Sequence, residues 1–221
     1  EMSASLVGSE MCIRDRSTGV YFRLIVFRKS GNNYVFQSAA DYTSNGASSP
    51  VLKKGKLLTR SGTIRVIGYS FNTTAALGDI PASYTYNTTK IDIPNMNNDF
   101  MTYDSGDIAN VNSLNYNLPV TFKQKLCKLT ISISVTGFTS NTISGCTGVY
   151  VKQGGNSTSW VIGSSAVAAN TSNTASFNPN TNQTTTIHMV PFASSRTITV
   201  HFNKLTVGNL IANNADNIDI A

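Results

Sequence analysis

Few side chains in this sequence have the type and spacing that catalysis or metal binding requires. The two histidines, His188 and His201, lie on separate predicted strands and match no zinc-site spacing, whereas zinc sites ordinarily recruit three or four ligands. Serine is abundant, but the chain has no Gly-x-Ser-x-Gly segment, the turn that exposes the nucleophile of many hydrolases. We therefore expect both histidines to be strand-surface residues, and we expect the protein to be no enzyme and to need no cofactor.

Acidic and amide side chains between residues 97 and 107 suggest a calcium site at first sight. Asp99, Asp104 and Asp107 follow closely on Asn97 and Asn98, and calcium prefers oxygen ligands on loops. The order Asp-x-Asp-x-Asp-Gly is absent, however. The better interpretation is a turn-rich loop in which Asp and Asn side chains satisfy backbone amides, and no metal site is predicted.

Four aromatic side chains could form a platform for a glycan. They are Trp160, Tyr84, Tyr86 and Tyr103. Tyrosines two positions apart on a strand are more often ordinary packing against neighbouring strands. The sequence leaves both interpretations open, and these four residues are the candidate glycan contacts.

Two cysteines, Cys127 and Cys146, belong to the folded part of the sequence. A disulfide between them would join two turn-connected strands, and spacing alone does not exclude it. We prefer two buried free thiols, because a chain of this size can bury an adequate core without a bridge.

The charge pattern does not suggest a nucleic-acid partner. The formal net charge is +6, but charged residues make up only 13% of the chain, against about 25% in typical soluble domains. Two turns carry the clustered lysines, namely Lys53, Lys54 and Lys56 in one and Lys123, Lys125 and Lys128 in the other. A nucleic-acid groove interleaves basic and aromatic residues on one face, so these lysines are better explained as edge residues that discourage aggregation.

Residues 1–16 are unlike the rest of the chain. Leu6 to Asp15 reads as the translation of a transposase adapter used in sequencing libraries, so we exclude residues 1–16 from the fold and treat Cys12 as no biological thiol. We expect the true N-terminus to be missing, which makes the lack of a signal peptide uninformative. No long apolar run elsewhere could cross a membrane.

The first half of the remaining chain alternates strands and turns. Val20 to Arg28 is β-branched and aromatic throughout and predicts a central strand, which turns at Gly31 into a returning strand from Tyr34. Residues 41–50 are predicted to be a loop, and Val51 to Leu58 a short edge segment. Thr63 to Asn72 predicts a clear strand, with Ile64, Val66, Gly68 and Ser70 on one face and Arg65, Ile67, Tyr69 and Phe71 on the other.

The second half repeats this pattern after a long break. Residues 73–116 are predicted to be mostly loop, with short extended pieces such as Ser83 to Tyr86. Further strands are predicted at Leu118 to Phe122, Leu126 to Val135, Gly148 to Lys152, Ser159 to Ile162, Thr184 to Met189 and Thr197 to Phe202. With no helical periodicity of useful length, the chain is predicted to be all-β, an antiparallel β-sandwich.

Three motifs follow the early strand YFRLIVFRK, namely Gly68-Tyr-Ser-Phe-Asn72, then Asp99-Phe-Met-Thr-Tyr103, then the segment from Leu118 to Leu129. In this order they resemble the fimbrillin family of Bacteroidales, the subunits of type V pili and their lipoprotein relatives. The last departs from the family pattern with Gln124 in place of His and Cys127 in place of a small residue. The resemblance covers residues 20–135 well.

The resemblance implies a transthyretin-like β-sandwich of Greek-key type. It implies one N-terminal fimbrillin-like domain over residues 17–207, with 208–221 starting a linker or a truncated C-terminal domain. It also implies a cell-surface or outer-membrane location within a fimbrium, and a lipid anchor upstream as the only link to the membrane.

The partners implied by the resemblance are other fimbrial subunits, joined by donor-strand exchange. An extended segment can pair with a sheet edge while its alternate side chains fill pockets. We expect an open groove or edge whose walls come from Leu129 to Val135 or from Thr63 to Phe71. The alternative is a carbohydrate-binding or host-adhesive surface module that meets a host or bacterial glycan or protein.

Overall fold

The computed structural model describes residues 2–3, 18–46, 48–93, 98–111, 117–132, 143–147, 149–177, 184–190, 200–207 and 210–220. Strands and turns account for these residues, and none of the described residues is helical, so no described helix could span a membrane. The predicted all-β, antiparallel class is confirmed. The chain forms two compact units, the first made of Glu1–Ile93, Asn98–Lys125 and Ser159–Val167, and the second of Pro94–Asn97, Leu126–Thr158 and Ala168–Ala221.

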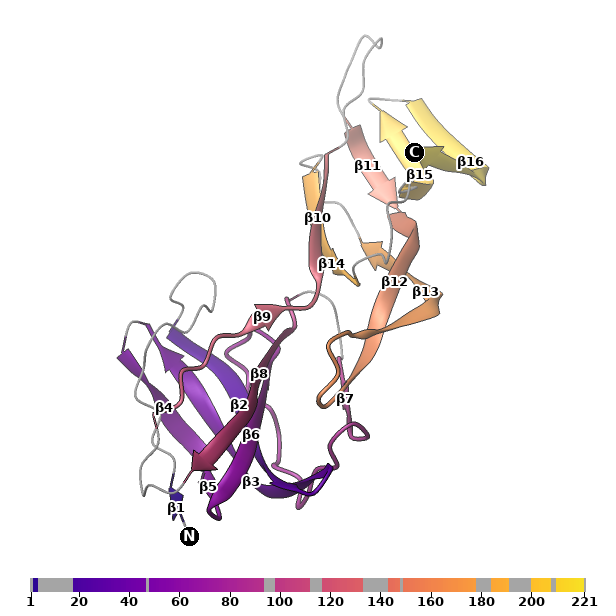
Figure 1. Cartoon of the computed structure of the whole chain (residues 1–221). Coiled ribbons are helices and arrows are strands. Elements are labelled where there is room, and N and C mark those ends of the chain that lie inside the picture. Colours follow the sequence, from indigo (N-terminus) through magenta and orange to yellow (C-terminus); the bar gives the residue numbers. More distant parts are fainter. Residues whose placement is uncertain are drawn as a thin grey trace. The chain divides into compact units, whose positions relative to one another are not determined.

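A six-stranded antiparallel sheet is the centre of the first unit (Figure 1). Its strands are β2 (Thr18–Ser30), β3 (Asn33–Asn45), β4 (Ser48–Gly55), β6 (Gly62–Ser70), β8 (Met101–Val111) and β9 (Lys123–Gln124). Their order in the sheet is β4-β3-β2-β6-β8-β9, and every neighbouring pair is antiparallel. β1 (Met2–Ser3) pairs separately with β5 (Leu58–Thr59).

The strand β2 is buried on both of its faces. Every residue from Phe22 to Phe27 is buried, so the alternation of a half-exposed strand is lost, as expected when both faces of a sheet are covered. One face joins a core cluster that includes Phe22, Leu24 and Val26 with Leu118, Val120 and Phe122. The extended residues 117–122, predicted to be a strand, carry no strand assignment but cover this face through their alternate side chains.

The opposite face of the sheet is covered by two segments that are far apart in sequence. From the loop 71–89, the ring of Tyr84 lies 5.5 Å from that of Phe36, and the ring of Tyr86 lies 5.5 Å from that of Phe27. From residues 159–167, Trp160 packs on the strand residue Tyr69 at 6.4 Å between ring centroids.

Residues 159–167 are held in the first unit by backbone pairing. The end of β12 (Val149–Val161) pairs with β7 (Lys90–Asp92) at Trp160 and Ile91. The Asn87 N–H donates to the Ile162 carbonyl at 2.9 Å. Ile162 and Trp160 are 0% and 1% exposed, so this distant segment supplies part of the core.

A buried ion pair ties the loop 71–89 to the sheet. Arg23 on β2 and Asp41 on β3 are 2% and 3% exposed and form two hydrogen bonds, Nε to Oδ1 at 2.6 Å and Nη2 to Oδ2 at 2.8 Å. The remaining guanidinium donors reach the Gly78 and Asp79 carbonyls and the Tyr84 hydroxyl, each at 3.0 Å. Burial alone would lower the pKa of Arg23, but Asp41 and the nearby tyrosines raise it, so the guanidinium stays charged.

The predicted loop over residues 41–50 is wrong, because β3 continues to Asn45 and β4 begins at Ser48 after a turn at Gly46. The polar residues that suggested a loop are buried with partners inside the sheet. Asp41 binds Arg23, and the Ser44 hydroxyl accepts a hydrogen bond from the Val20 N–H at 3.0 Å. The predicted turn at Gly31 and the edge position of residues 51–55 are confirmed.

The predicted loop over residues 73–116 is wrong in its second part, where β8 runs from Met101 to Val111. Between the register pairs Arg65–Asp107 and Ile67–Asp104, β8 carries one more residue than β6. Gly106 has a positive φ of 65° there, which defines a glycine β-bulge. The turn-like residues Asp-Ser-Gly-Asp are therefore a bulge inside a strand, and Ser83 to Tyr86 is not a strand.

The second unit contains β10 (Cys127–Ser132), β11 (Ile143–Thr147), β13 (Ala168–Phe177), β14 (Thr184–Met189), β15 (Val200–Val207), β16 (Leu210–Ile220) and most of β12. β10 and β14 form a two-stranded ribbon, and β15 pairs with β11, β12 and β16. The two strands predicted at 148–152 and 159–162 are one strand, β12. Residues 133–135 and 197–199 of the predicted strands lie outside the described residues, and the domain boundaries at 16/17 and 207/208 stay predictions.

Replacing Arg23 by methionine leaves Asp41 as an uncompensated buried charge. We expect the free energy of unfolding to fall by about 3–5 kcal/mol, measured by urea denaturation at pH 7. The double variant Arg23→Met/Asp41→Leu should recover most of this loss, because it removes both charges. The control Lys29→Met breaks an exposed pair and should cost far less, because solvent screens exposed ion pairs. A similar small cost for Arg23→Met would contradict the role of the pair.

Candidate functional site

A cavity of about 430 Å³ lies on the first unit, over the β6-β8-β9 part of the sheet. Its walls come from all three of these strands, from Thr121 before β9, from Lys125 after it and from residues 160–165. The lining residues are Arg65, Ile67, Thr102, Tyr103, Asp104, Thr121, Lys123, Lys125, Trp160, Gly163, Ser164 and Ser165. The volume falls within the range of about 300–1,000 Å³ that small-ligand pockets occupy.

The cavity has a buried floor and an exposed polar rim. Ile67, Thr102, Tyr103 and Trp160 of the lining are buried. The Trp160 Nε1–H donates to the Ser164 carbonyl at 3.0 Å, so the indole is fixed in place and its donor is already used. The exposed lining residues are Asp104, Thr121, Lys123 and Ser165.

Positive charge exceeds negative charge around the cavity. Asp104 is its one carboxylate, and both of its oxygens are bound by Arg65 at 2.8 and 2.6 Å. Lys123 and Lys125 make no ion pair in the described part of the chain, and the Lys125 ammonium donates to the Ser165 carbonyl at 2.8 Å. Burial, followed by the neighbouring charge of Lys123, lowers the pKa of Lys125.

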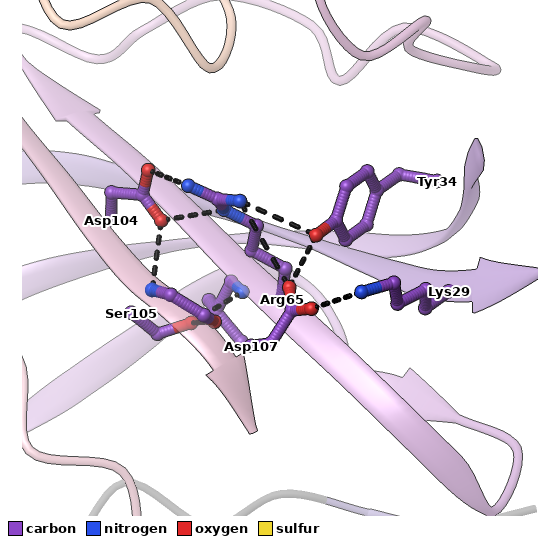
Figure 2. A network of polar contacts seen from close by, with 8 residues as sticks. Lys29, Tyr34, Arg65, Asp104, Ser105 and Asp107 are labelled. Carbon is purple, nitrogen blue, oxygen red and sulfur yellow. Dashed lines mark hydrogen bonds and ion pairs between the residues drawn. The ribbon is translucent and has the colours of Figure 1, made fainter. Parts of the chain in front are cut away.

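A surface network of charged residues continues from the cavity along β6, β8 and β2, as Figure 2 shows. Arg65 bridges Asp104 and the hydroxyl of Tyr34, and Asp107 accepts bonds from the Lys29 ammonium at 2.6 Å and from Tyr34. The hydrogen bond with Asp104 is the largest cause that raises the pKa of Arg65. The hydrogen bonds of Lys29 and Tyr34 lower the pKa of Asp107.

The bulge in β8 places the acidic residues of this network. The Ser105 hydroxyl accepts a hydrogen bond from the Val66 N–H at 2.8 Å, and Asp104 Oδ1 accepts one from the Gly106 N–H at 2.9 Å (Figure 2). Side chains thus replace ladder bonds where the register shifts. As a result, Asp104 and Asp107 lie on either side of the bulge, where Asp104 reaches Arg65 of the neighbouring strand β6 and Asp107 reaches Lys29 of β2.

The arginine of the network also lies over two tyrosine rings. The Arg65 guanidinium carbon is 5.5 Å from the ring centroid of Tyr34 and 5.4 Å from that of Tyr86, both within cation–π range. The two rings are 4.5 Å apart between centroids. Tyr86 therefore belongs to this network and is no cavity-lining residue.

The structure separates the four candidate glycan contacts. Trp160 and Tyr103 line the cavity, but both are buried, and the Tyr103 side chain packs in the core cluster on the other face of the sheet. Tyr84 is buried under the loop, where its hydroxyl accepts a bond from Arg23, and Tyr86 is half-buried beside Tyr34. No single exposed platform unites the four, and glycan contact by these residues stays a prediction.

The acidic cluster predicted to be a turn-rich loop lies on β8 and immediately before it. Asp104 and Asp107 are bound to Arg65 and Lys29, and Asp99 is buried. Among the residues that the structure describes, no three His, Cys, Asp or Glu side chains form a group able to hold a metal ion. Asn97 lies outside the described residues.

The histidines and cysteines lie on strands of the second unit. His188 of β14 pairs with Lys128 in register, and it is half-buried. His201 of β15 is 0% exposed, so the expected surface position is wrong for this residue. The Cys127 Sγ donates a hydrogen bond to the Met189 carbonyl at 3.3 Å. For Cys146 the structure describes the backbone only, which pairs with Leu205.

Sequence reasoning missed Lys29, Tyr34, Arg65 and the cavity lysines as members of one surface. The signal lies in the pairing of β6 with β8, where Arg65 stands opposite Asp107. Opposite charges across an antiparallel pair favour that register. Recognising this match requires that residues 101–111 first be assigned as a strand.

Comparison with protein-family models found no match, and comparison with curated proteins found none. Among solved structures, a candidate cell adhesion protein from Bacteroides uniformis covers 91% of this chain and 78% of its own length, with a TM-score of 0.53 and 16% identity. A candidate cell adhesion protein from Parabacteroides distasonis covers 94% of this chain and 74% of its own, with a TM-score of 0.50 and 14% identity. This chain has the fold of these proteins.

A further structural likeness is weaker. A fimbrial assembly protein from Parabacteroides distasonis covers 99% of this chain and 84% of its own, with a TM-score of 0.43 and 15% identity. All three proteins come from Bacteroidales. At such identities the likeness establishes the fold, and membership of the fimbrillin family stays an expectation from the sequence motifs.

The carboxyl group of Asp107 should titrate below the ordinary value of 3.8, because Lys29 and Tyr34 hydrogen-bond to its charged form. A pKa that is lowered in the folded state stabilises the fold at pH values above the unfolded-state pKa. This stabilisation is lost as the pH falls through the folded-state pKa. The pKa is measured by NMR titration of the Asp107 carboxyl carbon.

The variant Lys29→Met should raise this midpoint toward 3.8, whereas Lys53→Met, which removes a lysine of β4, should leave it unchanged. An Asp107 midpoint at or above 3.8 in the unmodified protein would refute the network.

Proposed function

We propose that the chain is a structural subunit or accessory protein of a cell-surface fimbrium that supports adhesion. It acts as a binding and assembly module and not as an enzyme, needs no cofactor or nucleic acid, and is joined to the outer membrane through a lipid anchor only. It assembles with other subunits by β-strand addition. The fold shared with candidate cell adhesion proteins and the three fimbrillin-like motifs support this role.

The ribbon of β10 and β14 is the observation that carries the assembly mechanism. Six consecutive residues of β10, Cys127 to Ser132, pair with β14, and in the described part of the chain β10 has no second strand partner. An isolated two-stranded ribbon is marginally stable in water. A strand from another subunit would complete the hydrogen bonds of β10 and make a three-stranded sheet.

Other strands are poorer sites for strand addition. The predicted wall Thr63 to Phe71 corresponds to β6, which pairs with β2 on one side and β8 on the other and has no open edge. The edge strand β4 presents Val51 and Leu52, 42% and 51% exposed, but also Pro50 and Lys53. Proline and lysine on an edge oppose pairing with another chain. Of the two predicted walls, β10 remains.

Strand addition between copies predicts that a segment of this chain protects the β10 amides. Overlapping 12-residue peptides that cover residues 17–221 are added singly to the full chain, and hydrogen exchange of residues 127–132 is followed by mass spectrometry. At least one peptide should slow exchange there, because a second strand partner closes the open edge. The peptide with the same composition in scrambled order is the control. If no peptide slows exchange in residues 127–132, assembly between copies by this edge is contradicted.

A surface location predicts that the protein is accessible on intact cells of its host. Antibodies raised against the first unit are expected to label intact cells and to label them no more strongly after permeabilisation. Pretreatment of intact cells with protease should abolish the signal, whereas a cytoplasmic control protein should survive it. Labelling that appears only after permeabilisation would contradict the surface role.

Carbohydrate binding is the second candidate function, and the cavity favours it. Its volume suits a small ligand, and two of the candidate glycan contacts, Trp160 and Tyr103, belong to its lining. Hydroxyl-bearing Thr121 and Ser165 stand on its rim. The accessible part of the cavity thus presents several polar groups that can bind sugar hydroxyls.

A further inference from the structure

The charges around the cavity are unbalanced. Arg65 and Asp104 neutralise each other through two hydrogen bonds, which leaves Lys123 and Lys125 as the net charge of the lining. The two lysines are close enough that the charge of Lys123 lowers the pKa of Lys125. Asp104 partly offsets this effect, but its carboxylate is already bound by Arg65, and an anion near the two ammonium groups would relieve the remaining repulsion.

The shape of the cavity limits the kind of anion. The apolar lining residues Ile67 and Trp160 are 0% and 1% exposed, so the groups that a ligand can reach are the polar groups of the rim. Thr121 and Ser165 on the rim bring hydroxyl groups close to the lysines. The rim hydroxyl groups can exchange hydrogen bonds with the hydroxyls of a ligand, and the lysine ammonium groups can donate to its charged group.

We propose that this cavity binds an acidic sugar, a pyranose whose carboxylate is held by Lys123 and Lys125 at the rim of the cavity. Charge-assisted hydrogen bonds from the two ammonium groups hold the carboxylate. The rim residues Thr121 and Ser165 face the sugar hydroxyls.

A sugar fits this cavity better than an acidic peptide. Each peptide residue brings a backbone N–H and C=O that need partners, and a bound strand finds them along an open sheet edge. The cavity instead lies over β6 and β8, whose backbones are paired with each other, and over the edge strand β9, which is two residues long and offers a bound strand few partners. A compact sugar acid needs only cationic and hydroxyl partners, and the cavity lining provides both.

The proposal deepens the carbohydrate-binding function and rests on it, but it is independent of strand addition at β10. The two experiments use different sites, so failure of one leaves the other standing. Peptide protection of residues 127–132 without sugar binding refutes only the present proposal. Sugar binding without peptide protection refutes only the assembly mechanism.

The test is calorimetric titration of the full chain with methyl β-glucuronide and with methyl β-glucoside, its neutral counterpart. We expect the glucuronide to bind at least about tenfold more tightly, because hydrogen bonds to a charged group contribute about 1.5–3 kcal/mol. Binding should weaken as salt is raised from 20 to 200 mM. Equal affinity for the two sugars, or no detectable binding of the glucuronide, would overturn the proposal.

Matched variants locate the site. Lys123→Gln and Lys125→Gln should each weaken glucuronide binding about tenfold or more, with unchanged circular dichroism. The control Lys53→Gln removes an exposed lysine of β4 that lines no part of the cavity and should bind like the unmodified protein. Equal losses in all three variants, or none in the cavity variants, would overturn the site.

The pKa of Lys125 gives a readout that a purely structural lysine would not. Lys123, Arg65 and Asp104 are the charged groups that line the cavity with it. A bound carboxylate adds a negative charge beside the ammonium, so the glucuronide should raise the Lys125 pKa in an NMR titration of its ε-carbon, whereas the glucoside should not. An acetylated Gly-Glu-Gly amide serves as the peptide probe. Tighter binding of this peptide than of the glucuronide would indicate a protein partner and refute the sugar assignment.

Discussion

The buried ion pair between Arg23 and Asp41 is the interaction on which the rest of the first unit depends. A guanidinium and a carboxylate taken from water are tolerated only when their donors and acceptors find partners. Arg23 binds both Asp41 oxygens, and its other donors reach two carbonyls and Tyr84 of the loop 71–89. The position of this loop follows from the hydrogen-bonding requirement of one side chain. With the loop in place, the second face of the sheet is covered, and β2 can be apolar on both sides.

The cover of that face is completed by residues 159–167, and the cavity follows from where this cover meets the sheet. Trp160 packs against Phe100 and Tyr69, with ring centroids 5.8 and 6.4 Å apart. Beyond the indole the sheet carries charged residues of β6 and β8, which no apolar cover could bury without unpaired charge. Polar groups therefore meet the edge of an apolar core there. Gly163 lies in the same segment as Trp160 and has a positive φ. A Cβ at this position would also lie 2.7 Å from the Tyr86 ring.

The sequence was sufficient for the apolar strands and insufficient for the polar ones. Val20 to Arg28 and Thr63 to Asn72 were predictable, and the predicted faces of the second strand agree with the burial of Ile64 and Val66 in the core cluster. Residues 41–45 and 101–111 were assigned to loops because Asp, Ser, Asn and Gly are typical of turns. Their partners lie 18 to 39 positions away along the chain, beyond the reach of local propensity. The cavity could not be predicted for the same reason, since its floor and rim come from four separate segments.

The distribution of edges gives a physical reason why the proposed strand addition would use the second unit. In the six-stranded sheet, the outer part of β8 carries a bulge and two acidic residues, and β4 carries Pro50 and lysines. Both features oppose pairing with another chain. The described ribbon of β10 and β14 has no such protection in its backbone, since its six register pairs are consecutive and without a shift. A regular strand with one described partner provides a template for a second, and the protected edges of the six-stranded sheet would confine the proposed strand addition to this ribbon.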